Sequence, residues 1–158
     1  MMNKRLKLRV QYKGARFLGW QSQKDFSPTV QGELNKCLKN IYKTEVKTLG
    51  SGRTDTGVHS LDQHVIYTPP FEIPLTGLVK GLNSELPSDI RVIAIDEVED
   101  EKFHITVSAT SREYRYLFTN NKQPSSFQED LMSNITFDLN FDRMRQACIL
   151  FVGLHNFE

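Results

Sequence analysis

One polar segment of the chain combines residue types that could perform chemistry. Residues 51–59 read Ser-Gly-Arg-Thr-Asp-Thr-Gly-Val-His, so that Arg53 precedes Asp55 by two positions. Glycines reach backbone conformations closed to other residues, so Gly52 and Gly57 allow a loop that presents the carboxylate at a fixed angle. A nearby arginine favours the ionised carboxylate and can also bind a phosphate or stack on a base. The pattern is typical of a loop that carries a nucleophile or a base, and it also fits an ordinary surface turn.

Two other interpretations of this segment are weaker. The triplet Asp-Thr-Gly at residues 55–57 is also the signature of aspartic proteases, whose two carboxylates share one proton. Arg53 would keep Asp55 ionised, which opposes that arrangement. A phosphate-binding P-loop requires Gly-Lys-Ser or Gly-Lys-Thr at the start of a helix. Gly57 is instead followed by Val58, and this spacing excludes a P-loop.

The charge of the chain is distributed unevenly. The 158 residues carry a net charge of +1, but residues 1–60 contain 12 Lys and Arg against 4 Asp and Glu, whereas the remaining residues contain 8 against 15. A basic region favours association with a polyanion, because neutralising phosphates releases counterions. The same charges also fit a solvated positive face, so charge alone leaves the two interpretations open.

Several classes of protein are disfavoured by the composition. No apolar run in the sequence approaches the roughly 20 residues that span a bilayer. The basic N-terminal residues are not followed by the apolar stretch of a signal peptide, and we expect a cytoplasmic protein without a membrane segment. Cys37 and Cys148 lie far apart and outside any Cys-x-x-Cys motif, which predicts buried free thiols. His59 and His64 have no third ligand near them in the sequence, so we expect no metal.

Hydrophobic periodicity predicts the order βαββαβ for the first part of the chain. Leu6, Leu8, Val10 and Tyr12 alternate with polar residues, as in a half-buried strand. Residues 28–43 place apolar side chains on one face at helical spacing. The fold class that follows is α+β, with a ferredoxin-like sheet backed by two helices. The expected elements are strands at residues 6–12, 45–50, 63–68 and 90–95, and helices at residues 28–43 and 75–82.

The remaining chain predicts the beginning of a second α+β unit. Residues 103–119 are strand-like, because aromatic residues alternate with other types there. Residues 141–152 have the apolar spacing of an amphipathic helix. We therefore expect a ferredoxin-like domain at residues 1–102 that carries the 51–59 loop, followed at residues 103–158 by a second, incomplete domain.

The chain resembles the TruA family of tRNA pseudouridine synthases in five regions. The family marker is a Gly-Arg-Thr-Asp-x-Gly-Val-His loop, which residues 52–59 match, and residues 83–90 match its Asn-x-x-Leu-Pro-x-Asp-Ile segment. Because the motifs follow one another in the family's order, the resemblance extends over the whole chain. The other matching regions are Tyr12-Lys13-Gly14 with Phe17, Gly19, Trp20, Gln21 and Gln23; Thr29-Val30-Gln31-Gly32-Glu33-Leu34; and Phe103-His104 with Ser108-Ala109-Thr110-Ser111-Arg112-Glu113-Tyr114-Arg115-Tyr116.

This resemblance implies a pseudouridine synthase fold and a function for the 51–59 loop. Asp55 would be the catalytic nucleophile that converts uridine to pseudouridine in the anticodon stem-loop of tRNA, with no cofactor. Arg53 would help to extrude the target nucleotide, because a base cannot rotate while it is stacked. Tyr114 would stack under the flipped uracil. The residues implied in RNA binding are Lys102, Phe103 and His104.

Two departures from the family pattern shape the expectation further. Asp62 occupies a position where relatives usually carry Gly, which adds a negative charge near the loop. The family continues beyond the segment that residues 151–157 resemble, so the second domain would be incomplete. An incomplete cleft predicts an inactive chain that exposes apolar surface and self-associates as a homodimer. The alternative function is a non-catalytic RNA-binding module that only binds tRNA.

Overall fold

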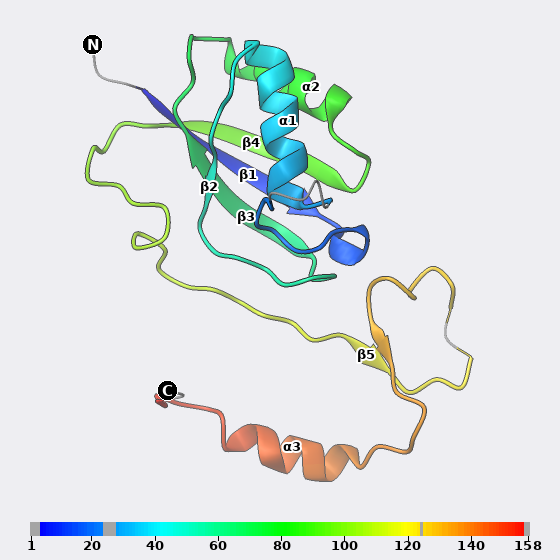
Figure 1. Cartoon of the computed structure of the whole chain (residues 1–158). Coiled ribbons are helices and arrows are strands. Elements are labelled where there is room, and N and C mark those ends of the chain that lie inside the picture. Colours follow the sequence, from blue (N-terminus) through cyan, green and yellow to red (C-terminus); the bar gives the residue numbers. More distant parts are fainter. Residues whose placement is uncertain (1–3, 24–27, 124, 157–158) are drawn as a thin grey trace. The chain divides into compact units, whose positions relative to one another are not determined.

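The computed structural model describes residues 4–23, 28–123 and 125–156. The chain divides into one unit at Met1–Arg112 and a second at Glu113–Glu158. The first unit consists of a sheet and its helices, labelled in Figure 1. Its elements are β1 (Arg5–Tyr12), the short 3-10 helix η1 (Gly14–Arg16), α1 (Val30–Tyr42), β2 (Leu49–Gly50), β3 (Ser60–Tyr67), α2 (Leu75–Glu85) and β4 (Ile90–Val98).

The four strands of the first unit pair in the order β2-β3-β1-β4, and each pair is antiparallel. Helix α1 joins β1 to β2, and α2 joins β3 to β4, so each connection passes over one intervening strand. This is the split βαβ arrangement of a ferredoxin-like sheet. The α+β class and the βαββαβ order predicted from the sequence are confirmed.

The central strand β1 shows how residue alternation produces this sheet. Its side chains are buried at every second position from Leu6 to Tyr12, while Arg9 and its neighbours on the other face are only half-buried. Leu8 is paired with Val65 of β3 and with Ile95 of β4, and all three side chains are buried. One face of the sheet therefore forms the hydrophobic core.

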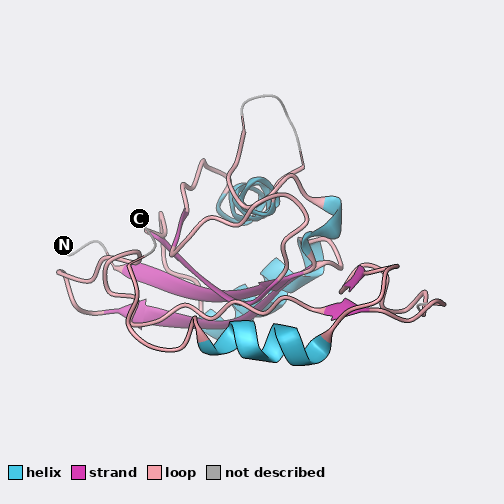
Figure 2. Cartoon of the chain, turned by 90° about the horizontal axis from the view of Figure 1, so that it is seen from below, coloured by secondary structure: helices cyan, strands magenta, loops and turns pink. Residues whose placement is uncertain are grey.

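Helix α1 covers the core face of the sheet. It begins at Val30 rather than at residue 28, because Thr29 caps it: the Thr29 hydroxyl oxygen accepts a hydrogen bond from the Gly32 amide at 3.2 Å. Leu34 and Leu38 are fully buried on its inner face. Figure 2 shows α1 end-on, on one side of the sheet.

Helix α2 also packs on the core, and its C-terminal end is tied to β4. Leu78 and Leu82 are buried, so tertiary packing keeps the helix continuous through Gly77. The side chain of Asn83 makes two hydrogen bonds with the backbone of Val92. Its amide donates to the Val92 carbonyl at 2.8 Å, and its carbonyl accepts from the Val92 amide at 2.9 Å.

Residues 99–112 follow β4 and are held on the first unit by two arginines. Arg5 of β1 donates to the carbonyls of Phe103 at 3.0 Å and of Asp100 at 2.7 Å. Arg112, at the end of the segment, donates to the carbonyl of Ser51 at 3.0 Å and, within the segment, to that of Thr106 at 3.2 Å. Ile105, in the same stretch, is only 3 % exposed. The segment is thus anchored without belonging to a strand.

The predicted strand at residues 103–119 is largely wrong. Residues 103–108 instead form a turn, in which the Ser108 amide donates to the His104 carbonyl at 2.8 Å. The alternation beyond it produces no strand up to residue 117, because a strand also needs a ladder of backbone hydrogen bonds and none of the described ladders includes these residues. Only the strand β5 (Phe118–Thr119) forms, paired in parallel with β6 (Ser133–Asn134). The expected strand at residues 45–50 is likewise reduced to β2.

The second unit contains β5, β6 and the helix α3 (Phe141–Ile149). The predicted amphipathic helix is present, and the Asn140 side chain caps it by accepting from the Arg143 amide at 2.9 Å. None of the residues of α3 is buried. Among the residues that the structure describes, no helix has the length and apolar character needed to span a membrane.

Candidate active site

The 51–59 loop lies against residues 13–20, which follow β1. Backbone hydrogen bonds link the two segments: the Trp20 amide donates to the Thr54 carbonyl at 3.0 Å, and the Gly57 amide donates to the Phe17 carbonyl at 3.3 Å. The Gly14 amide also donates to His59 Nδ1 at 3.2 Å. These contacts hold the loop before, within and after its central turn.

Two glycines make this close approach possible. A Cβ atom at Gly14 would lie 1.9 Å from the Val58 carbonyl oxygen, so no other residue fits there without moving the backbone. Gly19 has a φ of +86°, and a Cβ atom there would lie 2.7 Å from the Thr54 carbonyl oxygen. Both glycines, from the Tyr-Lys-Gly and Phe-x-Gly-Trp motifs, therefore allow the 51–59 loop to approach closely, and Gly19 also provides the left-handed conformation of its own backbone.

Aromatic residues support the loop from the core side. The hydroxyl of Tyr12, at the end of β1, is hydrogen-bonded to the Thr54 hydroxyl at 2.8 Å. Trp20 is 1 % exposed, and its indole ring lies so close to Gly50 that a Cβ atom there would be 2.7 Å from it. The Tyr12 and Trp20 ring centroids are 6.1 Å apart. Burial raises the pKa of Tyr12, so its hydroxyl stays neutral as a partner for Thr54.

The first two residues of the loop are held by β3 and by Arg112. The Ser51 amide donates to the His64 carbonyl at 2.8 Å, and Arg112 donates to the Ser51 carbonyl at 3.0 Å. The Gln63 side chain donates to the Gly52 carbonyl at 2.5 Å. The backbone that leads into the loop is therefore bonded at successive positions.

The side chains of Arg53 and Asp55 are exposed, in contrast to the hydrogen-bonded backbone that carries them. Neither makes a hydrogen bond or an ion pair with any residue that the structure describes, and they do not pair with each other. The chain turns directly after them, where the Val58 amide donates to the Asp55 carbonyl at 3.2 Å and Gly57 has a φ of +80°. A rigid backbone thus presents a carboxylate and a guanidinium to solvent.

Asp62 is paired within the sheet. Both of its carboxylate oxygens accept hydrogen bonds from Arg9, at 3.0 and 2.9 Å, and His64 Nε2 lies 3.5 Å from one of them. The hydrogen bonds from Arg9 lower the pKa of Asp62. Its extra negative charge, expected from the sequence near the loop, is therefore balanced by an adjacent cation.

The histidines take structural positions. His59 accepts the Gly14 hydrogen bond through Nδ1, and His64 lies beside Asp62. Within the described part of the chain, no group of three or more His, Cys, Asp or Glu side chains is arranged to hold a metal ion.

The other residues implied in RNA contact lie outside the loop. Lys102 and His104 are exposed and Phe103 is half-buried, in the 99–112 segment that Arg5 anchors. Tyr114 belongs to the second unit, where its side chain is 81 % exposed.

Three residues that hold backbone in the first unit were missed by sequence reasoning. Arg5, Gln63 and Arg112 each donate to backbone carbonyls. Gln63 and Arg112 lie inside or next to the family motifs, and this position is the one signal that could have indicated them. Arginine and glutamine are typical of a polar surface, whereas these three side chains are hydrogen-bonded to backbone carbonyls of the same chain.

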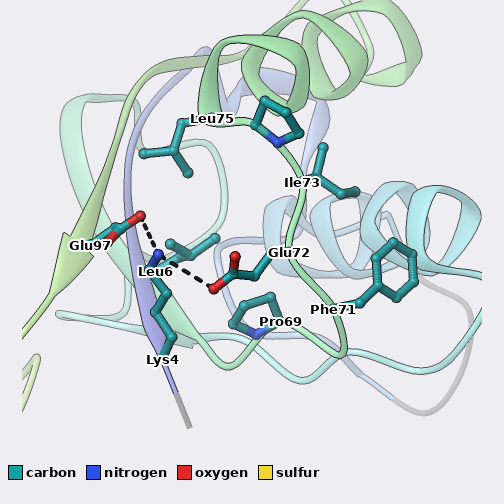
Figure 3. A pocket seen from close by; sticks show the side chains of 9 residues that line it. Lys4, Leu6, Pro69, Phe71, Glu72, Ile73, Leu75 and Glu97 are labelled. Carbon is teal, nitrogen blue, oxygen red and sulfur yellow. Dashed lines mark ion pairs between the residues drawn. The ribbon is translucent and has the colours of Figure 1, made fainter. Parts of the chain in front are cut away.

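A cavity of about 390 Å³ lies at the opposite end of β1 from the 51–59 loop. Apolar side chains form much of its wall, and Lys4 contacts Glu97 at 2.6 Å and Glu72 at 3.6 Å beside it (Figure 3). The charges at this cavity are therefore paired, in contrast to those of Arg53 and Asp55. Apolar lining residues include Leu6, Phe71, Ile73 and Leu75.

Comparison with known proteins gives a consistent family. Residues 9–107 match a family model described as tRNA pseudouridine synthase. A tRNA pseudouridine synthase A of Oceanobacillus iheyensis is 38 % identical over 154 residues, which cover 97 % of this chain and 60 % of that protein. A protein of the same name from Halalkalibacterium halodurans is 37 % identical over 155 residues, covering 98 % and 58 %. The chain thus spans about 60 % of the length of these curated relatives.

Proposed function

The chain belongs to the tRNA pseudouridine synthase family, and from this premise we propose that it converts uridine to pseudouridine in tRNA, with Asp55 as the catalytic residue. The main support for the proposal is the contrast between the backbone of the 51–59 loop and the Asp55 side chain. Its backbone is hydrogen-bonded to residues 13–20 and to β3, while the Asp55 carboxylate is exposed and has no partner among the described residues. Such a group is placed in advance for a substrate.

The reaction is an isomerisation, so its atoms balance within one nucleoside. The bond between N1 and the ribose C1′ breaks, the base rotates, and a bond forms between C5 and C1′. C5 loses a proton and N1 gains one. The Asp55 carboxylate can attack C1′ directly or remove the 2′ proton, and both routes require its ionised form.

Arg53 is proposed to stabilise the extruded nucleotide. The target base must leave its stack before it can turn, and extrusion leaves a gap in the stack and a displaced phosphate. A guanidinium can fill the gap by stacking on the neighbouring bases, and it can bind the displaced phosphate through two hydrogen bonds. Because Arg53 is exposed and forms no ion pair with the described residues, its charge is available for this role.

The proposal extends to further roles, which are suggested by resemblance to the family. We place the target uridine in the anticodon stem-loop and the enzyme in the cytoplasm. Tyr114 would stack on the flipped uracil, and Lys102, Phe103 and His104 would contact the RNA. A homodimer is proposed because the second unit exposes large apolar side chains, among them Leu150, Phe151 and Leu154.

A second candidate function is a non-catalytic tRNA-binding module. It is favoured by one observation: the chain spans about 60 % of the length of its curated relatives. If residues needed for turnover lie in the unmatched part of those relatives, these 158 residues would bind tRNA and form no product.

One experiment separates these functions. The chain is incubated with an unmodified tRNA transcript, and pseudouridine is scored by nucleoside mass spectrometry, for the natural sequence, for Asp55→Asn and for Asp62→Asn. Product that Asp55→Asn removes and Asp62→Asn retains supports the enzyme. Binding of the transcript without product supports the module. Absence of binding at low salt would contradict both.

A further inference from the structure

Arg112 joins two parts of the chain that are distant in sequence. Its Nη2 nitrogen donates to the Ser51 carbonyl at 3.0 Å and to the Thr106 carbonyl at 3.2 Å. Ser51 is the first residue of the 51–59 loop, and Thr106 lies in the 99–112 segment. The Arg112 Nε nitrogen is also close to the loop, since a Cβ atom at Gly52 would lie 3.7 Å from it.

The partners of Arg112 among the described residues are backbone carbonyls. It forms no ion pair with a carboxylate among residues 4–23, 28–123 and 125–156, although its charge would favour one. A guanidinium carries its N–H donors in a rigid fork. A hydrogen bond from a charged donor contributes more than a neutral one. Arg112 therefore uses a strong donor to hold backbone rather than to neutralise a side chain.

Gln63 acts on the next carbonyl of the same stretch. It is 7 % exposed, and it donates to the Gly52 carbonyl at 2.5 Å. The carbonyls of Ser51 and Gly52 are thus both held, directly before Arg53. On the other side of Arg53, Thr54 is held by Tyr12 and Trp20. The peptide planes that set the direction of Arg53 are consequently fixed from both ends.

We propose that Arg112 is a positioning residue for the isomerisation, acting through the Ser51 carbonyl on the placement of Arg53 and Asp55 and not through contact with RNA phosphate. This inference rests on the proposed function. It also gives the 99–112 segment a mechanical link to the loop, because the same nitrogen holds Thr106.

The test compares Arg112→Gln and Arg112→Lys with Arg145→Gln as a control. Arg145 is an exposed residue of α3 in the second unit, so its substitution removes the same charge from an element that makes none of the hydrogen bonds described for the loop. Three quantities are measured: hydrogen exchange of peptides covering residues 49–60, the salt dependence of tRNA affinity, and kcat and KM for pseudouridine formation. Near-ultraviolet circular dichroism confirms that each variant is folded.

We expect Arg112→Gln to accelerate exchange in residues 49–60 by about tenfold or more and to lower kcat by about 10- to 100-fold, because small misplacements of catalytic groups are costly. KM and the slope of log affinity against log salt should stay unchanged. Arg112→Lys should restore part of kcat, since an ammonium can still donate to one carbonyl. Arg145→Gln should leave exchange and kcat as they are.

Different results overturn the inference. A phosphate contact would instead reduce the salt slope by about 0.7 to 0.9 with unchanged exchange. Unaltered kcat in Arg112→Gln, with product formed by the natural chain, rejects the positioning role alone. Failure of the natural chain to form product rejects the proposed function, and the positioning role with it, whatever the exchange shows.

Discussion

Gly14 and the backbone of Val58 are in direct contact, since a Cβ atom at residue 14 would lie 1.9 Å from the Val58 carbonyl oxygen. Gly14→Ala must therefore displace either residues 13–20 or the 51–59 loop. Overpacking of this kind costs about 1 to 3 kcal/mol of unfolding free energy. We also expect loss of the hydrogen bond from the Gly14 amide to His59, and a fall in pseudouridine formation. Urea unfolding and the tRNA product assay measure the two effects.

Gly57→Ala is the control for this substitution. Gly57 has a φ of +80°, so alanine is strained there, but a Cβ atom would meet nothing within 4 Å. Its cost should be about 1 kcal/mol, from backbone strain alone. A loss of stability in Gly57→Ala that equals or exceeds the loss in Gly14→Ala would show that the close approach to Val58 is not the limiting constraint.

Gly77→Ala should stabilise the protein. Gly77 lies inside α2, with helical φ, and nothing lies within 4 Å of a Cβ atom there. Alanine reduces the conformational freedom of the unfolded chain, which raises the unfolding free energy by about 0.5 to 1 kcal/mol. Urea unfolding followed by circular dichroism measures the change.

Gly81→Ala is the companion variant in the same helix. Its Cβ atom would lie 3.7 Å from the Ile41 side chain, an ordinary contact, so we expect a gain of similar size. If both alanines destabilise the protein, α2 does not have the helical continuity described above.

Much of the first unit could be predicted from periodicity, and the largest failure, at residues 103–119, has a clear cause. The alternation of Leu6, Leu8 and Val10 predicts β1 correctly because both faces of that strand are determined by burial. A similar alternation at residues 103–119 led to a wrong strand prediction, because a strand also needs a partner strand at hydrogen-bonding distance. Alternation within one segment carries no information about that partner.

The site was predictable only as far as its motif. The positions of Asp55 and Arg53 in a glycine-bounded loop follow from residue types, and their proposed roles follow from family resemblance. The contacts of Arg112 did not follow, since Ser51 lies 61 positions earlier in the chain. An arginine that binds a backbone carbonyl has no local pattern, because carbonyls occur at every residue.

The ion pair of Asp62 predicts a pH dependence of stability. Arg9 lowers the folded-state pKa of Asp62 below its ordinary 3.8, so the unfolded state takes up this proton more readily. The stabilisation is therefore present above about pH 4 and is lost as the pH falls through the folded-state pKa. The Asp62→Asn variant should have a lower unfolding free energy at pH 7, and its unfolding free energy should fall less steeply as the pH is lowered. The effect is small because the pair is exposed.

Urea midpoints between pH 2.5 and pH 7 test this dependence, with Asp130→Asn as the control. Asp130 forms no ion pair with the residues that the structure describes, so its removal should leave the acid decline unchanged. Parallel pH profiles for Asp62→Asn and the natural chain would show that Arg9 does not shift the titration of Asp62.

The two cysteines should differ sharply in reactivity. Cys37 is 3 % exposed, and burial raises its pKa to about 12, so the reactive thiolate is strongly disfavoured at pH 8. Cys148 is exposed on α3, so the burial predicted from the sequence is wrong for this cysteine, because none of the residues of α3 is buried. Iodoacetamide at pH 8 should add one label rapidly and a second only in urea, as read by intact mass. The Cys148→Ser variant should take up no label under native conditions. Two labels at equal rates would mean that the core around Cys37 opens readily.

The two hydrogen bonds between Asn83 and Val92 bear on whether the edge of β4 can pair with a strand of another chain. β4 is the outermost strand of its sheet, and an outer strand offers unpaired peptide groups to any passing chain. The Asn83 amide has the same donor and acceptor as a peptide group, so it occupies the place of one residue of a neighbouring strand. A helix thereby shields one peptide group of a β-edge. Loss of that amide would open a site for intermolecular strand pairing, and its consequence would be measured in turbidity and light scattering as well as in unfolding free energy.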